Sequence, residues 1–355
     1  MRDGYVKEKG GNKMNNNECT AAEKLLIIGN GFDRAHFLPT GYNDFKKYMS
    51  NLIRAYQGEE ESEELLDLKE IPEAGRPKIY TKNGIIDDYG SESKIVYWLI
   101  DEAARKKGDI NWGKFENYLG QLNIKKVLKK WGKNDAAVHV LRDSIDDIKG
   151  FFFEWINTID LSVAQKRQPY LSVIDGKRDI AISFNYTETL ETVYGMKSSN
   201  ICYIHGQRET NPVLQQEKSM LPLGKYNLSL VVGFGSKYLR NKRQIRKKLL
   251  LMGLYKDTSS IIYEHKDFFN KVEASDIKEI YSLGFSFSDA DMPYVNKVCN
   301  ELNRKNDARE LIWFITPYGK NRLKKCAKNY ICENAFGGLD LGGKFEKCDR
   351  EYSCL

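Results

Sequence analysis

The chain has 355 residues, of which 41% are hydrophobic, 30% charged and 12% aromatic, and its formal net charge is +7. This is the composition of an ordinary globular protein, long enough to bury one large core or two modest ones. The charge permits an anionic ligand without requiring nucleic acid. There is no apolar run of the ~20 residues that a membrane span needs and no signal-peptide pattern, so we expect a cytoplasmic protein that does not bind membranes.

Seven cysteines are scattered along the chain, and no two of them form a CxxC pair. Only the spacings Cys326/Cys332 and Cys348/Cys354 approach a metal-binding pattern. Free thiols in a reducing compartment are therefore preferred to a zinc site, and we expect no bound metal.

The first predicted strand is LLIIG at 25–29, a short buried run that follows a disordered segment at 1–20. A helix is expected to begin near Asn43 or Asp44, whose side chains can cap it. The sequence then predicts a helical insertion over about 45–175.

Two stretches inside the insertion stand out. The segment 59–70 has seven acids in twelve positions, which is typical of a solvated helix or loop. The segment WGKFENYL places Glu116 among aromatic residues.

Strand signals return after residue 178. Apolar runs end at Gly, Asn, Asp or Pro in RDIAISFNY, NICYIHG, LSLVVGFG, IKEIYSLGFSFSD and ELIWFITP. Strands that alternate with helices predict an α/β fold with a Rossmann-like parallel sheet. We expect a single domain at 21–320, with the helical insertion after its first strand, and a C-terminal tail at 321–355.

A glycine turn, Gly29-Asn30-Gly31, directly follows the first strand. Two glycines allow a tight turn and a close approach of ligand to backbone, and a helix starting there would favour an anion. The turn is therefore a candidate phosphate cradle, with a purely structural turn as the alternative. Arg34 replaces the third glycine of the dinucleotide fingerprint, so this motif alone is not specific.

Polar residues follow four of the predicted strands: Asn30 and Asp33 follow the first, and Asn185, His205, and Asp289 with Asp291 follow three of the others. Ligands bind at the carboxyl ends of the strands in parallel sheets. Polar residues at four strand ends together therefore predict a binding site.

These motifs carry a resemblance to a known family. The segments LLIIGNGFDRAHFLPTGYNDF, FNYTETLE, IHG and YSLGFSFSDADMPY resemble the bacterial abortive-infection AbiH family over about 24–320. That family is in turn similar to sirtuin-like NAD-consuming domains. The glycine turn differs from that of true sirtuins, and their zinc-binding cysteines are missing, so protein deacylation is not expected.

The resemblance implies an anti-phage effector that binds NAD or a related nucleotide, as ligand or substrate, and hydrolyses it to nicotinamide and ADP-ribose. Asn185 and His205 would be catalytic. The nucleotide would be bound by Gly29, Asn30, Gly31, Phe32, Asp33, Tyr186, Gly284, Ser286 and Asp291. Nicotinamide leaves as a neutral molecule, so an amide that orients water or ribose and a histidine that accepts a proton would suffice.

Each of these residues also has a structural interpretation. Asn185, Asp33 and Asp291 could cap helices, and His205 could be a turn residue. His36 and His265 are expected to be structural, and Glu116 a partly exposed helical acid.

Two other functions stay open. One is a metal-dependent nuclease or phosphoesterase with Asp33, His36, His205 and Asp291 as ligands. The other is a non-catalytic nucleotide sensor. The resemblance is also compatible with a homo-oligomer or with a partner protein of a defence system. The basic segment 237–248 could contact nucleic acid, although a solvated helix is preferred.

Overall fold

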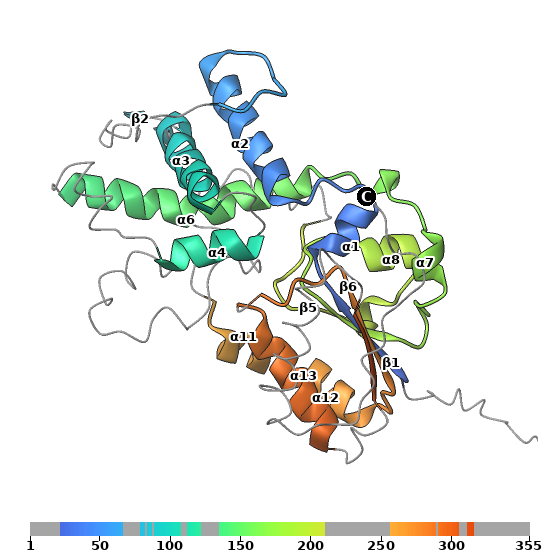
Figure 1. Ribbon diagram of the computed structural model, residues 1–355. Coiled ribbons are helices and arrows are strands. Elements are labelled where there is room, and N and C mark those ends of the chain that lie inside the picture. Colours follow the sequence, from blue (N-terminus) through green and yellow to red (C-terminus); the bar gives the residue numbers. More distant parts are fainter. Residues whose placement is uncertain are drawn as a thin grey trace, which may run out of the picture.

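The computed structural model describes residues 22–66, 79–81, 84–86, 89–107, 112–121, 135–209, 256–288, 290–304 and 311–315. A central sheet carries helices on both faces, and a second group of helices stands beside it (Figure 1). The segments 1–20, 228–235, 237–248 and 321–355, for which the sequence makes predictions, lie outside the described residues, as does Asp289.

Five described strands form the sheet, in the order β5-β4-β1-β6-β7, and every neighbouring pair is parallel. Their bounds are β1 Lys24–Ile28, β4 Ile180–Ser183, β5 Ile201–Tyr203, β6 Glu279–Leu283 and β7 Ile312–Ile315. Numbered along the chain, this is the order 3-2-1-4-5 of a Rossmann sheet. The predicted α/β fold with a Rossmann-like parallel sheet is confirmed.

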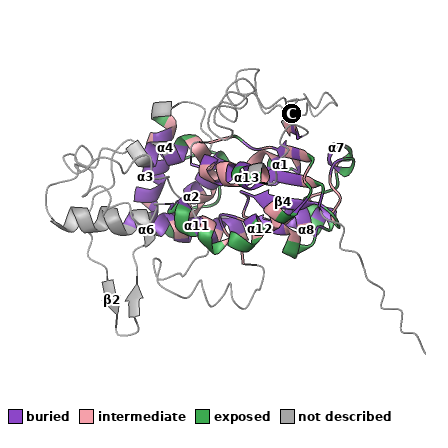
Figure 2. Ribbon diagram, turned by 90° about the horizontal axis from the view of Figure 1, so that it is seen from below, coloured by how far each residue is buried: buried purple, intermediate pink, exposed green. Residues whose placement is uncertain are grey.

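Helices cover both faces of the sheet, which is why β1 and β4 are apolar without alternation. One face carries α11 (Thr258–Glu264), α12 (Lys266–Ala274) and α13 (Met292–Arg304); the other carries α1 (Asn30–Ala35), α7 (Gln168–Leu171) and α8 (Thr189–Tyr194) (Figure 1). Leu25 and Ile27 of β1 pack on the first face, and Leu26 and Ile28 on the second. Figure 2 shows the resulting buried layer, with exposed residues on α8, α11 and α12.

The helical insertion lies between β1 and β4 in the sequence. Its main helices are α2 (Tyr42–Gln57), α3 (Tyr89–Lys107), α4 (Trp112–Gln121) and α6 (Asp135–Asn157), with a small hairpin of β2 (Ile79–Thr81) and β3 (Gly84–Ile86). These helices enclose a hydrophobic cluster of their own, in which Phe45, Phe152 and Trp155 meet at ring-centroid distances of 5.2–5.6 Å. None of the described helices combines the length and apolarity required to span a bilayer.

The start of α2 differs slightly from the prediction. Gly41 is the N-cap, and its backbone N–H donates to the Asp44 carboxylate at 2.7 Å. Asp44 therefore stabilises the helix start from inside the first turn, and Asn43 is not the cap. Gly58, with φ of +73°, ends the helix.

Candidate functional site

The glycine turn after β1 packs against the turn after β6. Gly31 N–H donates to the Gly284 carbonyl at 2.9 Å, and Gly29 N–H donates to the Leu283 carbonyl at 3.0 Å. A Cβ on Gly29 would lie 2.5 Å from the Cα of Phe285. The glycines thus let two backbones touch, whereas the sequence analysis assigned them to the approach of a ligand.

Asn30 and Phe32, the other predicted nucleotide contacts of this turn, have partners within the protein. Asn30 Oδ1 accepts a hydrogen bond from the Thr40 hydroxyl at 2.6 Å. Phe32 is buried under the sheet, with its ring centroid 4.9 Å from that of Tyr170 and 5.8 Å from that of Tyr194. The Phe32 side chain is therefore part of the core.

Asp33 ties α1 to the loop after β4. Its two carboxylate oxygens accept hydrogen bonds from Thr187 Oγ1 at 2.5 Å and Thr189 Oγ1 at 2.9 Å. Burial raises the pKa of Asp33 to about 6 in spite of these bonds. Because α1 begins at Asn30 with Gly29 as its N-cap, Asp33 is not a helix cap.

Asn185 joins the end of β4 to the glycine turn. Its Nδ2 donates to the Gly29 carbonyl at 3.1 Å. A carbonyl can only accept, so this bond fixes the orientation of the amide and leaves Oδ1 as its acceptor end. Oδ1 is buried and has no hydrogen-bond partner among the described residues. Helix α8 has Glu188 as its N-cap, so Asn185 is not the cap of that helix.

His205, which follows β5, is surrounded by charged groups. Its Nε2 lies 3.4 Å from Asp291 Oδ1 and 3.5 Å from Lys256 Nζ. The same Nζ lies 2.6 Å from Glu116 Oε1 and 3.7 Å from Asp291 Oδ1. These four side chains, His205, Lys256, Glu116 and Asp291, form what we call the His205 cluster.

Burial and charge set the protonation states in the His205 cluster. Burial and the Lys256 ammonium lower the pKa of His205 well below its ordinary value, although a hydrogen bond to the Phe184 backbone opposes them. Burial would also lower the pKa of Lys256, but the Glu116 and Asp291 carboxylates outweigh it and raise that pKa. With a neutral imidazole, one ammonium and two carboxylates, the cluster carries a net charge of about −1.

Aromatic rings enclose the imidazole of His205. The centroids of Phe184, Tyr294 and Tyr186 lie 5.4, 5.8 and 6.1 Å from its own. Tyr186 also packs against Phe152 of α6 at 4.8 Å, which connects the site to the helical insertion. Burial raises the pKa of Tyr186, so its hydroxyl stays protonated.

The loop after β6 contributes Asp291 and Ser286. Asp291 directly precedes α13; its Oδ2 accepts from the Ser288 hydroxyl at 2.8 Å, while Oδ1 faces His205. Ser286 is exposed. The structure thus brings Asp291 to His205 and Asn185 to Gly29.

The four residues of the metal-dependent alternative are not gathered in one place. His36 packs on the α1 side of the sheet, with Nδ1 2.7 Å from the Phe32 carbonyl and Nε2 2.7 Å from the Tyr194 hydroxyl. Within the part of the chain that the structure describes, no three His, Cys, Asp or Glu side chains are arranged to hold a metal ion.

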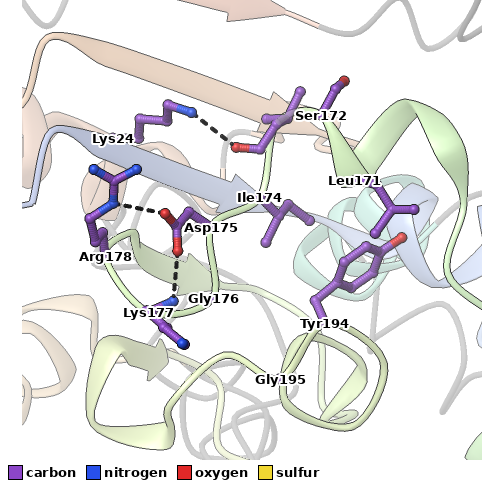
Figure 3. A pocket seen from close by; sticks show the side chains of 11 residues that line it. Lys24, Leu171, Ser172, Ile174, Asp175, Gly176, Lys177, Arg178, Tyr194 and Gly195 are labelled. Carbon is purple, nitrogen blue, oxygen red and sulfur yellow. Dashed lines mark hydrogen bonds and ion pairs between the residues drawn. The ribbon is translucent and has the colours of Figure 1, made fainter.

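A cavity of about 550 Å³ lies at the opposite end of the sheet, beside the start of β1 (Figure 3). It is lined by Lys24, residues 171–178, Tyr194 and Gly195. Two of its charged groups are engaged locally: Lys24 Nζ donates to the Val173 carbonyl at 3.3 Å, and Arg178 Nε pairs with Asp175 at 2.8 Å. Because ligands of parallel sheets bind at the carboxyl ends, this cavity is not the candidate site.

Sequence reasoning missed Lys256, Thr187 and Thr189. The hydroxyls of both threonines donate to Asp33, and Thr189 is also the first residue of α8. No local pattern marks Lys256, which precedes the N-cap of α11. Glu116 was noted for its aromatic neighbours, and the structure shows it buried against Lys256 instead of partly exposed.

Comparison with protein families supports the resemblance found in the sequence. The model of the family described as "Bacteriophage abortive infection AbiH" matches residues 25–314. Curated proteins and solved structures give no significant match. The matched residues include the carboxyl ends of β1, β4, β5 and β6 and the His205 cluster, and they span most of the chain. The chain therefore belongs to the bacteriophage abortive infection AbiH family.

Proposed function

We propose that this protein is an abortive-infection effector that binds NAD or a related nucleotide and hydrolyses its nicotinamide–ribose bond. Asn185 and His205 act at the ribose, and the Gly29–Gly31 turn and the loop after β6 bind the rest of the nucleotide. Family membership supports the defence role. The similarity of the motif order to that of sirtuin-like domains supports NAD as the ligand.

The arrangement of Asn185 and His205 carries the proposal. Ser183 and Tyr203, the last residues of β4 and β5, are paired partners in the sheet. Asn185 and His205 each lie two residues after these partners, so they follow the ends of neighbouring strands. Asn185 is 4% exposed, and its Oδ1 lacks a partner among the described residues. A buried acceptor of this kind is costly unless a donor reaches it, and a ribose hydroxyl or the attacking water is such a donor.

The charge of the His205 cluster suits this reaction. The C1′–N bond breaks with both electrons leaving on neutral nicotinamide, and positive charge develops on the ribose. A net negative cluster stabilises that charge and also attracts the cationic pyridinium. Water then bonds to C1′, and its proton passes to the neutral imidazole of His205.

Binding at the glycine turn would change existing hydrogen bonds. The N–H groups of Gly31 and Phe32 donate to the carbonyls of Gly284 and Gly29. A pyrophosphate bound by these donors would replace those carbonyls. We therefore expect nucleotide binding to shift the loop after β6, on which Ser286 and Asp291 lie.

Nicotinamide release from NAD by the purified protein tests the proposal. His205→Gln and Asn185→Ala should abolish release. His265→Gln is the matched histidine control, because His265 is a half-buried residue between α11 and α12 that lies outside the His205 cluster and affects His205 only through its charge. Asn51→Ala is the asparagine control, because Asn51 lies on α2 of the helical insertion, where it accepts the Ser62 N–H. Both controls should retain activity.

The other outcomes are equally informative. Thermal stabilisation by NAD that requires Asn185, without nicotinamide release, would overturn hydrolysis and support the nucleotide sensor. Release that persists in His205→Gln would remove His205 from the chemistry. If the protein neither releases nicotinamide nor is stabilised by NAD, the proposal as a whole is contradicted.

A further inference from the structure

Lys256 is one of the most completely buried charged residues that the structure describes. Its side chain is 1% exposed, although a lysine usually keeps its ammonium in water. Its Nζ lies 2.6 Å from Glu116 Oε1, 3.5 Å from His205 Nε2 and 3.7 Å from Asp291 Oδ1. A buried ammonium is tolerated only where anions compensate it, and here both anions also lie at the proposed site.

Four different parts of the fold meet at this ammonium. Lys256 precedes α11, His205 follows β5, Asp291 precedes α13, and Glu116 lies on α4. Glu116 is the member of the His205 cluster that comes from the helical insertion, and it makes the shortest contact to Lys256. The insertion therefore reaches the carboxyl end of the sheet through a buried ion pair.

We propose that Lys256 is a positioning residue for His205 and that Glu116 holds Lys256 in place, so that the helical insertion is a working part of the site. The ammonium beside Nε2 keeps the imidazole neutral and therefore able to accept a proton. This inference rests on the proposed function only in taking His205 as the proton acceptor.

The charges predict opposite effects for the two partners. Removing the ammonium leaves two carboxylates near the imidazole and favours its protonated form. Removing the Glu116 carboxylate leaves the ammonium and favours the neutral form. The titratable and charged groups around His205 are Lys256 and Asp291 beside Nε2, the rings of Tyr186 and Tyr294, and the charge of His265; Glu116 joins them through its contact with Lys256.

NMR titration of the histidine rings measures the effect directly. The chain has four histidines, so His205→Gln assigns the signal of interest. Lys256→Met should raise the pKa of His205 by about one unit or more, a tenfold change in proton affinity. Glu116→Gln should leave that pKa as low as in the unchanged protein or lower. In the double variant Lys256→Met/Glu116→Gln the pKa of His205 should be lower than in Lys256→Met alone but still higher than in the unchanged protein, because the Asp291 carboxylate remains 3.4 Å from Nε2.

A matched control separates this role from general loss of a buried lysine. Lys46 is also buried and lies 2.6 Å from Asp101 inside the insertion. Lys46→Met should leave the pKa of His205 unchanged. If Lys256→Met does not fold, the double variant is used for the titration, because it also removes the Glu116 carboxylate that Lys256→Met leaves unpaired.

An unchanged or lowered His205 pKa in Lys256→Met, or in the double variant where that is used, would overturn the inference. An equal rise in Lys46→Met or in Glu116→Gln would also overturn it. The titration needs no NAD. A titration result that contradicts the role of Lys256 can therefore be distinguished from a failure of the protein to release nicotinamide.

Discussion

The backbone N–H of Gly31 donates to the carbonyl of Gly284 at 2.9 Å, which joins the loop after β1 to the loop after β6. In a sheet of this order the chain leaves these two neighbouring strands toward opposite faces, and the space between their loops is where ligands bind. In this structure the two backbones are in direct contact there.

Gly284→Ala should be severely destabilising, by about 3 kcal/mol or more. Gly284 has φ of +63°, and a Cβ there would lie 2.1 Å from Phe32 N and 2.3 Å from the Gly31 carbonyl carbon. These neighbours are backbone atoms of the adjacent turn and cannot move independently. Urea unfolding, or the amount of folded protein, measures the effect.

Gly58→Ala is the control for the backbone conformation alone. Gly58 has φ of +73° with open space around it, so alanine should cost only about 1 kcal/mol. Equal losses of stability in Gly284→Ala and Gly58→Ala would show that the contact of Gly284 with the neighbouring turn does not contribute to the cost of the substitution.

The buried pair of Lys46 and Asp101 should respond asymmetrically to substitution. The two side chains are 10% and 9% exposed and 2.6 Å apart, and Arg105 lies 2.7 Å from the other oxygen of Asp101. Asp101→Leu leaves the Lys46 ammonium buried without its carboxylate and should cost about 3–5 kcal/mol. Lys46→Met leaves Asp101 paired with Arg105 and should cost about 1–2 kcal/mol. Urea unfolding of the two variants and the double variant gives the coupling, and the reverse order of losses would contradict this account.

The sheet and the location of the site could be predicted because both follow from local patterns. Short apolar runs mark strands that are buried on both faces, and the polar residues after them must meet, since parallel strands end at the same edge. Asn185 and His205 were selected in this way as candidate site residues. Their positions in space follow from the pairing of Ser183 with Tyr203.

The contacts within the site could not be predicted, because they join distant parts of the chain without a local signal. Lys256 is 51 residues from His205, and Thr187 is 154 residues from Asp33. Thr189 is the first residue of α8 and also donates to a buried carboxylate, and nothing in the local sequence marks this second role. Gly284 was expected to contact a ligand, and its conformation instead reflects the neighbouring turn.

Asp33 should make stability fall as the pH rises. Its pKa is about 6 in the folded protein, against an ordinary value of 3.8, so the folded state binds more protons between these two values. Stability is therefore highest below pH 3.8 with respect to this group and is lost as the pH rises through 6, by about 3 kcal/mol in total. Asp33→Asn keeps an acceptor for the threonines and should remove this dependence. Urea unfolding at pH 4.5–7.5, a range of ~3 units around that pKa, measures it.

Asp179 should add a second fall in stability of the same sign as the pH rises. Burial raises its pKa to about 6 as well, and it lies at the other end of the sheet, just before β4. Asp33→Asn and Asp179→Asn should therefore each remove part of the dependence, and their effects should add because the sites are independent. An unchanged slope in Asp33→Asn would show that Asp33 titrates as an exposed carboxylate.

The proposed hydrolysis should have an acid limb at unusually low pH. His205 must be neutral to accept a proton, and burial together with Lys256 lowers its pKa well below 6.5. The rate of nicotinamide release should therefore not fall as the pH decreases from ~7.5 to 6.5, where an ordinary histidine would become protonated. Because Asp33 titrates near 6, the profile is best measured in Asp33→Asn as well.

In Lys256→Met the acid limb should move to higher pH, because the two remaining carboxylates favour the imidazolium. The shift in the rate profile should equal the shift in the His205 pKa measured by NMR. An acid limb near pH 6.5 in the rate of the unchanged protein would mean that Lys256 does not keep His205 neutral during turnover. A limb that moves in Lys256→Met without any change in the His205 titration would assign the proton acceptor to another group.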